Sequence, residues 1–507
     1  MVKEIGRRDF VKNMALTGAA LAGAAALGGC SQSSASDSSS IKWDEETDVL
    51  VIGSGFAGCA AAIEAAMAGA QVKVLEKMDV TGGNSRICGG AMAVANSPLQ
   101  EKEGIKDSPE LLVEDMLKAG LGLNHVEKVR MIAEKSLETL QWTIDLKVEW
   151  SDQMMWPGGH AVMRTYRAAN NSGSGILEPA LAKLKELGVP VETNAKMARI
   201  ICDENKRVQG VEVINSYKFS SDSGSGSRYI KAKKAVVLAG GGFGANVTLR
   251  TSQDPRLTEE IDCTNHPGCT GDALLEALRI DALPVHLSWI QLGPWASPDE
   301  KGFGLTPFFS TLEGAQWGIM VDPATGKRII NEMGDRKQKS DAILATGHAA
   351  VMFVDSVGIQ TVQEGVVDKI LNKTMWKFDS LDELASHFEI PADALKQEVA
   401  RYNSFVANGE DLDFHKQTIK MATLIEKPPF YAVRLWPKVH HCMGGVMTDL
   451  ECKVMDLNLE VIKGLYAAGE IAGGTHGACR VGSCAILDSL VCGRVAGTCA
   501  AKEEAWA

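Results

Sequence analysis

Residues 48–58 read Asp-Val-Leu-Val-Ile-Gly-Ser-Gly-Phe-Ala-Gly, a short apolar run that passes directly into a Gly-x-Gly-x-x-Gly motif. The apolar run predicts a buried parallel strand, and the Ala-rich stretch 59–68 predicts a helix. Residues 71–76 predict a second strand that ends at Glu76, 23 positions after Gly53. This order is typical of a dinucleotide-binding unit, in which the helix N-terminus receives a pyrophosphate and the acid accepts hydrogen bonds from ribose hydroxyls. A turn with a purely structural role is the alternative.

Three further glycine-rich segments follow along the chain. The first, 81–90, comes directly after the second predicted strand, while 234–243 and 464–470 each read as a buried strand that ends in glycine. If these strands meet at one sheet edge, their glycines would lie along the length of an extended cofactor. A domain that binds only a nicotinamide does not need the first segment, so the pattern favours non-covalently bound FAD over NAD.

The composition fits a soluble, loop-rich α/β enzyme with more than one domain. The chain has 507 residues and 51 glycines, 45% of the residues are hydrophobic and 23% are charged. We expect an α/β fold with a Rossmann-like FAD-binding domain in two parts, 45–285 and 419–507, and an α+β capping domain, 286–418, inserted between them. The formal charge of −12 and the lack of a Lys/Arg cluster argue against a nucleic-acid partner.

The first 44 residues predict export. Arg7 and Arg8 open a stretch that resembles a twin-arginine signal peptide, 1–29, whose apolar part is too short and too weakly apolar for a stable membrane span. Residues 27–30 resemble a lipobox, which would make Cys30 a lipid-bearing residue on a flexible Ser-rich tether, 30–44. Cleavage without lipid is the alternative. The expected location is the outer face of the cytoplasmic membrane or the periplasm.

Twelve cysteines in an exported protein suggest disulfides, but their spacing is unlike a disulfide framework. The chain contains no Cys-x-x-Cys-His motif, so no c-type haem is expected. Cys479, Cys484, Cys492 and Cys499 leave an iron–sulfur cluster open, and buried, unreactive thiols are the interpretation that we favour.

Five later segments share motifs with one known family. They are residues 158–164, 264–272 and 331–336, the Val-His-His-Cys-Met-Gly-Gly stretch at 439–445, and His-Gly-Ala-Cys-Arg at 476–480. With the glycine segments, they resemble the soluble fumarate reductase flavoprotein family, here without a haem domain. That family includes the flavin domain of flavocytochrome c fumarate reductase, urocanate reductase and ketosteroid dehydrogenases.

The resemblance implies a role for each matched residue. Arg336 corresponds to the family's proposed proton donor, and His440 and Arg480 correspond to the groups that hold a substrate carboxylate. Ser483 is also expected to contact the substrate. The residues expected to bind FAD are Gly53, Gly55, Ala57, Gly58, Glu76, Lys77, Gly83, Asn84, Ser85, Gly89, Gly90, Met197, Ala239, Gly240, Gly241, Asp272, His441, Glu470, Ala485 and Ile486.

The adjacent histidines, His440 and His441, are badly placed to bind one metal ion. In an extended strand neighbouring side chains point to opposite faces, and no other His or carboxylate stands nearby at metal-ligand spacing. We therefore expect no metal, with one histidine facing the substrate and the other the cofactor. A structural role for both is the alternative.

Two departures from the family pattern bear on the substrate. Family fumarate reductases carry a histidine for the second carboxylate in a Gln-x-His-Pro segment, whereas residues 291–294 read Gln-Leu-Gly-Pro, with Gly293 at that position. The Thr-Glu pair and the arginine that follow in the family are missing from 310–314. The same region is rich in aromatic residues, which either line the pocket or pack in the cap: Trp289, Trp295, Phe308, Phe309 and Trp317.

A single carboxylate clamp with apolar surroundings predicts an α,β-unsaturated monocarboxylate, such as an aryl acrylate, rather than fumarate. An unpaired second carboxylate would cost several kcal/mol of desolvation, while a flat aromatic group would stack and bury area. Hydride from flavin N5 would add to the polarised alkene, and Arg336 would protonate the α-carbon. The alternative is that Arg336 only holds the substrate's charge.

Three rival functions stay open at this point. Fumarate or urocanate reduction and a steroid-type enone reductase or dehydrogenase use the same fold. A non-catalytic electron-transfer flavoprotein is a different class, disfavoured because binding FAD requires none of Arg336, His440 and Arg480. Without a haem, the electrons are expected from an external donor such as a membrane-associated cytochrome.

Overall fold

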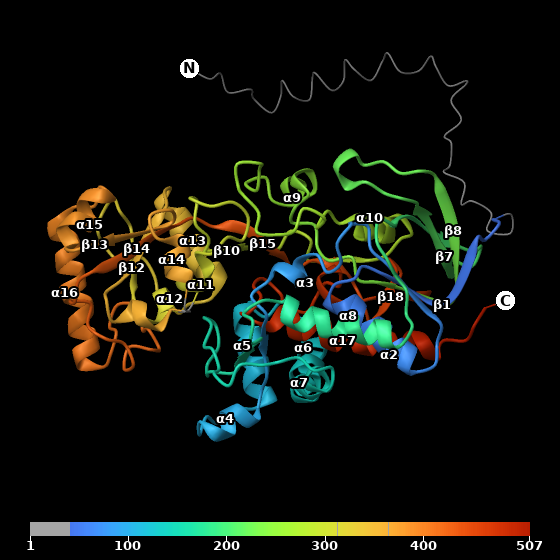
Figure 1. The fold of residues 1–507 in the computed structure, drawn as a ribbon, viewed down its shortest axis with the longest axis horizontal. Coiled ribbons are helices and arrows are strands. Elements are labelled where there is room, and N and C mark those ends of the chain that lie inside the picture. The colour runs from blue at the N-terminus through green and yellow to red at the C-terminus, as the bar shows by residue number, and fades with distance from the viewer. Residues whose placement is uncertain (1–40, 312, 363–364, 507) are drawn as a thin grey trace, which may run out of the picture.

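The computed structural model describes residues 41–506, except residues 312, 363 and 364. The expected signal peptide, including Arg7 and Arg8, and Cys30 lie outside the described residues. The described part is an α/β molecule with a large body and a smaller one, joined through a two-stranded link (Figure 1).

The large body is built on an eight-stranded sheet. Its strand β1 (Glu45–Ile52) contains the apolar run before the glycine motif and pairs in parallel with β2 (Val72–Leu75) and β8 (Ser227–Leu238). Residues 49–52 are buried, as expected for a strand that is covered on both faces. The other strands are β5 (Val191–Glu192), β6 (Lys196–Cys202), β7 (Val208–Ile214), β17 (Lys453–Met455) and β18 (Val461–Ala467).

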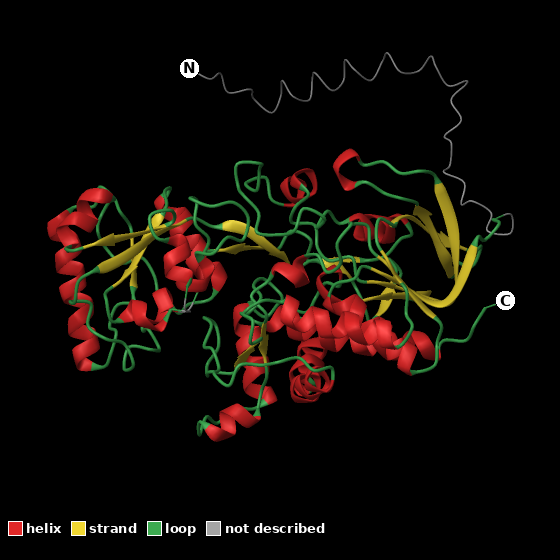
Figure 2. Ribbon diagram, in the orientation of Figure 1, coloured by secondary structure: helices red, strands yellow, loops and turns green. Residues whose placement is uncertain are grey.

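Three helices cover one face of this sheet: α2 (Phe56–Met67), α8 (Ser174–Glu186) and α17 (Cys484–Lys502) (Figures 1 and 2). By length and composition α17 could cross a membrane, yet most of it is buried inside the protein, as in a core helix. The other face packs against α10 (Asp272–Arg279), together with buried side chains of β6 and β7, the hairpin that continues the sheet from β8. The glycine turns therefore open at the carboxyl ends of β1 and β8, where ligands of parallel sheets bind.

Shorter elements surround the large body and support the loops of the site. They are α3 (Asn84–Ile87), α4 (Pro98–Lys102), α5 (Pro109–Ala119), α6 (Val126–Glu134), α7 (Ser136–Asp145), α9 (Val247–Gln253), the pairs β3 (Ala91–Ala93) with β4 (Thr165–Arg167) and β9 (Pro284–Val285) with β16 (Gly445–Val446), and 3₁₀ turns at Phe219–Ser221 and Gly469–Ile471. A further 3₁₀ turn, Gly358–Thr361, belongs to the cap.

The smaller body is an α+β cap built on a four-stranded antiparallel sheet, β11 (Ile319–Val321), β12 (Ala350–Val354), β14 (Phe430–Leu435) and β13 (Met375–Phe378). Helices α15 (Leu381–His387) and α16 (Ala392–Asn408) pack on one face. The other face carries α11 (Pro307–Ser310), α12 (Glu313–Trp317), α13 (Arg336–Thr346) and α14 (Val366–Ile370). Because β14 lies after residue 418, we place the return of the chain to the large body after Leu435; the predicted domain limits otherwise stay a prediction.

Strands β10 (Ile290–Gly293) and β15 (Lys438–Cys442) form the antiparallel link between the two bodies. Gln291 pairs with His441 in this ladder, so the two histidines of the 439–445 stretch lie on the link itself. Side chains from the large body, the link and the cap can therefore meet at one place.

Candidate active site

Two adjoining cavities lie along the carboxyl edge of the large sheet. The first, of about 140 Å³, follows the glycine turn after β1. The second, of about 220 Å³, lies between the large body, the link and the cap. The two cavities are continuous, because they share five lining residues: Phe56, Asn84, Ser85, Glu470 and Ser489.

The turn between β1 and α2 requires glycine at its first and last motif positions. Gly53 has a φ of +108°, and a Cβ there would lie 2.4 Å from the Ala239 carbonyl oxygen. A Cβ on Gly58 would lie 1.9 Å from the Gly53 carbonyl oxygen, so α2 starts directly against the turn. The N-cap Gly55 supplies no side-chain cap to α2, and the first turn of α2 holds no acid. This helix end therefore fits the pyrophosphate of a dinucleotide.

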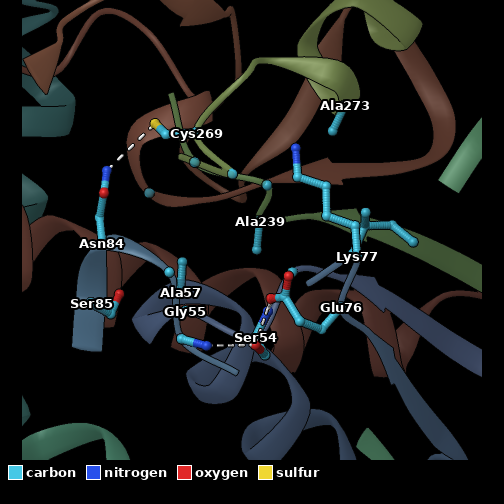
Figure 3. A pocket seen from close by; sticks show the side chains of 18 of the residues that line it. Ser54, Gly55, Ala57, Glu76, Lys77, Asn84, Ser85, Ala239, Cys269 and Ala273 are labelled. Carbon is cyan, nitrogen blue, oxygen red and sulfur yellow. Dashed lines mark hydrogen bonds between the residues drawn. The ribbon is translucent and has the colours of Figure 1, made fainter. Parts of the chain in front are cut away.

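Glu76 closes the far side of the first cavity at the end of β2 (Figure 3). One of its carboxylate oxygens accepts hydrogen bonds from the Ser54 backbone N–H at 3.2 Å and the Ser54 hydroxyl at 2.6 Å. Beside it, the Lys77 ammonium pairs with Asp272 at 2.8 Å. Anchored in this way, the carboxylate fits the ribose-binding position that the sequence predicts.

The structure brings the expected cofactor residues together along these cavities, with one exception. Gly58 lines neither cavity and lies behind the turn, where its missing side chain permits the close contact. The first cavity is lined by Gly53, Gly55, Ala57, Glu76, Lys77, Gly83, Asn84, Ser85, Met197, Ala239, Gly240, Gly241, Asp272 and Glu470. The second is lined by Gly89, Gly90, His441, Ala485 and Ile486, with Asn84, Ser85 and Glu470 shared. Their roles stay predictions.

Arg336, His440, Arg480 and Ser483, the expected catalytic and substrate residues, all line the second cavity. Arg336 is the first residue of α13, and its Nη1 donates to Gln291 Oε1 at 3.1 Å. Arg480 lies 3.2 Å from His440 through Nη2 and Nε2. Ser483 is the N-cap of α17 and has a φ of +64°. Three elements distant in sequence therefore converge on one site.

His440 is held as a neutral imidazole. Since a guanidinium can only donate, Nε2 of His440 must accept the bond from Arg480, and Nδ1–H then donates to the Thr264 hydroxyl at 2.7 Å. Burial lowers the pKa of His440 well below its usual value, and the charges of Arg336 and Arg480 lower it further. The histidine therefore orients the arginine without adding a third positive charge.

The two arginines form a buried positive centre, and Glu470, an acid that lines the same cavity, forms an ion pair with neither of them. Burial, and then the charge of Arg480, lower the pKa of Arg336 well below the usual value, and burial also lowers the pKa of Arg480. Among the described residues neither guanidinium takes part in an ion pair, and Nε of Arg480 is buried without a hydrogen-bond partner. Such a centre is costly unless an anion completes it, so the site fits a carboxylate ligand.

His441 faces different partners from its neighbour. Its Nδ1 lies 3.5 Å from Glu470 Oε1, its ring lies 5.6 Å from that of His476, and its Nε2 is buried without a hydrogen-bond partner. Burial raises the pKa of Glu470 to about 7. The two histidines thus do not converge on one point, and the described residues contain no group of three or more His, Cys, Asp or Glu side chains that could hold a metal ion.

Aromatic side chains form a further wall of the second cavity. Of the five aromatic residues weighed from the sequence, Trp295 and Phe308 line it, while Phe309 and Trp317 pack in the cap and Trp289 is not part of the lining.

Sequence reasoning missed Phe303, which also lines the second cavity. It stands between Gly302 and Gly304, which both have positive φ, and the Glu300 carboxylate closes this loop by accepting from the backbone N–H groups of Leu305 and Thr306. The two flanking glycines were the available signal. Other lining residues missed in this way are Met155, Arg167, Pro307 and Thr311.

The described cysteines are all free thiols, and most are buried. Cys479 contacts the Gln291 amide at 3.2 Å, and the Cys492 thiol donates to Asp488 at 3.1 Å. Burial raises the pKa of Cys484 to about 12, which keeps this thiol protonated. Thiols in this state are poor metal ligands and poor nucleophiles.

Comparison with known proteins gives consistent matches across the chain. The model of the FAD binding domain family matches residues 48–486. The chain is 42% identical over 500 residues to the acrylate reductase flavoprotein subunit of Shewanella woodyi, covering 97% of both chains. It is 35% identical over 462 residues to the fumarate reductase (cytochrome) of Shewanella frigidimarina, covering 90% of this chain and 77% of that protein. A solved open conformation of a flavocytochrome c3 fumarate reductase matches with a TM-score of 0.71 and 30% identity, over 99% of this chain and 82% of that one.

Proposed function

The chain belongs to the FAD binding domain family, among the fumarate and acrylate reductases, and we propose that it reduces an α,β-unsaturated monocarboxylate with an apolar or aromatic β-substituent. Family membership confirms the expected fold class and FAD as the cofactor, and the protein is an FAD-dependent oxidoreductase that acts on carbon–carbon double bonds. The substrate, the residue roles and the cellular context are the proposed parts.

One observation carries the proposal: the second cavity is positive in one place and apolar in another. Arg336 and Arg480 supply buried positive charge and form no ion pair among the described residues, while Trp295, Phe303 and Phe308 supply aromatic surface. A carboxylate at the arginines completes their charge, and an apolar β-substituent against the rings buries its surface. The acrylate reductase relative supports an unsaturated monocarboxylate in general.

The first cavity suits FAD because the α2 N-terminus, the Gly53 turn and the Glu76 carboxylate are arranged along it. The N-terminus of α17, at Ser483, opens into the second cavity and favours negative charge on a flavin ring placed there. When bound and reduced, FAD supplies a hydride equivalent for the β-carbon of the alkene.

Arg480, oriented by the neutral His440 imidazole, holds the substrate carboxylate and stabilises the negative charge that develops on it as the alkene π electrons move toward the α-carbon. Arg336, oriented by Gln291, then gives a proton to the α-carbon, which completes the saturated acid. The lowered pKa of Arg336 makes it a better acid than an exposed arginine. If Arg336 instead only balances charge, a lysine in its place would keep most of the activity.

A dicarboxylate such as fumarate is the second candidate substrate. Arg167 also lines the cavity, with its guanidinium 5.7 Å from the Phe308 ring. Its positive charge would bind the second carboxylate in place of the histidine that is missing at position 293. The fumarate reductase relative supports this candidate.

The proposal includes the cellular context. Arg7 and Arg8 would direct export of the folded, FAD-loaded protein, and Cys30 would carry a lipid that holds it at the outer face of the cytoplasmic membrane. An external electron donor, such as a membrane-associated cytochrome, would then reduce the flavin.

The test is the anaerobic oxidation of a reduced viologen by the FAD-loaded protein, with fumarate, urocanate, acrylate, cinnamate, hydroxycinnamates and a steroid enone as acceptors. We expect turnover with the aryl acrylates and little with fumarate. Fast fumarate turnover without cinnamate turnover contradicts the proposed substrate class.

A matched pair of variants on α13 tests the site in the same assay. Arg336→Ala should retain FAD and lose at least about 100-fold in kcat, a typical loss for a proton donor. Lys337→Ala, at the neighbouring residue that pairs with Asp341 on the protein surface, should keep wild-type turnover. An Arg336→Ala protein that turns over normally would show that the proton comes from another group.

A further inference from the structure

At the end of β10, the Trp295 ring lies against the position that a side chain at residue 293 would take. A Cβ on Gly293 would lie 2.9 Å from Cη2, 3.0 Å from Cζ2 and 3.2 Å from Cζ3 of the Trp295 ring. The φ of Gly293 is not in the left-handed region, so its strand backbone would accept any L side chain. A side chain at position 293 would therefore require the indole ring to shift. By the resemblance, fumarate reductases of the family carry a histidine at this position.

The Trp295 ring also joins the parts of the substrate cavity. It stands edge-on to His440 with ring centroids 4.7 Å apart, and the guanidinium carbon of Arg336 lies 5.6 Å from the ring. It also packs against Phe303, with ring centroids 5.3 Å apart, and the Phe303 ring lies 6.4 Å from that of His440. The Trp295 side chain thus contacts both the cationic centre and the aromatic wall.

We infer that Gly293 and Trp295 act together as the determinant that selects an apolar β-substituent over a second carboxylate. This inference rests on the proposed function. The glycine leaves room for the indole, and the indole fills the position from which a polar side chain at 293 would reach the substrate. The selectivity requires both residues, because a side chain at position 293 would displace the Trp295 ring from its place against the substrate.

The physical reason is a difference in desolvation. An apolar or aromatic β-substituent against the indole ring buries apolar surface and forms an edge or stacked contact. A carboxylate at the same place loses its water and faces a ring without gaining an ion pair from either residue. Differences of this kind change kcat/KM by factors of about 10 to 200 for an apolar group and by more for a charged one.

The first test measures the coupling between the two positions without substrate. Thermal unfolding of the FAD-loaded protein is followed for the wild type, Gly293→Ala, Trp295→Ala and the double variant. We expect Gly293→Ala to lower Tm in the wild type and to be nearly neutral when residue 295 is alanine. Trp289→Ala, which removes a tryptophan of the same segment outside the cavity lining, should leave the cost of Gly293→Ala unchanged. An equal loss of Tm on Gly293→Ala in the wild type, in Trp295→Ala and in Trp289→Ala would show that Gly293 and Trp295 do not compete for the same space.

The second test measures kcat/KM for cinnamate, acrylate and fumarate. Trp295→Ala should lower the value for cinnamate by at least about tenfold and that for acrylate, which has no β-substituent, by less than about threefold. Trp295→Phe, which keeps an aromatic ring, should lie between the wild type and Trp295→Ala. Gly293→His combined with Trp295→Ala should raise the ratio of fumarate to cinnamate turnover at least about tenfold relative to wild type.

The outcomes separate this inference from the function on which it rests. Equal losses for cinnamate and acrylate in Trp295→Ala would mean that the ring only supports His440 and Arg336, and would overturn the inference. An unchanged fumarate to cinnamate ratio in the double variant would also overturn it, while leaving the proposed function intact. A wild-type protein that reduces fumarate and not cinnamate would contradict the proposed function itself.

Discussion

Glu470 is a buried carboxylate whose ionisation opposes folding. Its side chain accepts a hydrogen bond from the Cys442 backbone N–H at 2.9 Å, yet burial raises its pKa from 4.5 to about 7. Because the pKa in the folded protein exceeds that in the unfolded chain, the contribution to stability is complete below about pH 4.5 and is lost as the pH rises through about 7. A shift of this size corresponds to about 3 kcal/mol.

We therefore predict that Glu470→Gln flattens the pH dependence of stability in the FAD-free protein. Between pH 5 and pH 8 the unfolding free energy of the wild type should fall by about 2.5 kcal/mol relative to the variant. Urea unfolding at pH 5, 6, 7 and 8 measures this difference. Parallel pH profiles for the two proteins would mean that the carboxylate is already ionised in the folded state.

At the residue scale, sequence patterns predicted which polar residues meet in one cavity better than they predicted the residues around them. Arg336, His440 and Arg480 were expected from short motifs, and all three line one cavity. Phe303 was not expected because its place depends on a loop whose glycines take positive φ and whose ends are held by Glu300. The ring contact between Gly293 and Trp295 could not be read from their spacing either, because it depends on the turn that follows β10.

Helices α2 and α17 of the large body pack closely against each other, and glycine makes this possible. A Cβ on Gly497 would lie 2.1 Å from the Ala61 carbonyl oxygen, and one on Gly493 would lie 2.4 Å from that of Ala57. The same two helices present their N-termini to the two cavities. Their separation therefore sets the positions of Gly55 and Ser483 relative to each other.

Gly497→Ala should lower the unfolding free energy by about 1–3 kcal/mol, because overpacking forces the helices apart. Intrinsic helix propensity acts in the opposite direction by about 1 kcal/mol, so a net loss identifies the steric contact as the larger effect. Chemical unfolding of the FAD-loaded protein measures the change, and Thr498→Ala, at the adjacent half-buried position, serves as the control. Stabilisation by Gly497→Ala would show that the helices can separate without cost.

At the element scale, local patterns predicted the strands and turns of the FAD-binding body, since each parallel strand is a buried apolar run next to its own glycines. They did not predict where the cap ends. Strand β14 pairs with β12, about 80 residues earlier in the chain, and with β13, and nothing local at residues 430–435 records those partners. The segment after residue 418 was therefore assigned to the large body.

At the scale of the whole molecule, the active site depends on the junction between the two bodies. Arg336 comes from the cap, His440 from the link and Arg480 from the loop before α17 in the large body. None of these three parts holds the site alone. The described residues form no disulfide, and the buried thiols stay protonated at neutral pH. The site is therefore assembled only when the two bodies are in place, and the proposed export in the folded state is consistent with this.

Export and anchoring give the last prediction. Arg7→Lys combined with Arg8→Lys should leave the FAD-loaded protein in the cytoplasm, because the twin-arginine pair is the address that the export route reads. Cys30→Ser should still be exported but should move from the membrane to the soluble fraction.

A diacylglyceryl group carries two acyl chains, each methylene contributes about 0.8 kcal/mol of membrane binding, and one chain alone is marginal. Fractionation with labelled palmitate measures both effects, and Cys202→Ser, which removes a thiol far from the signal, should keep the label. Label that persists in Cys30→Ser would place the lipid on another residue.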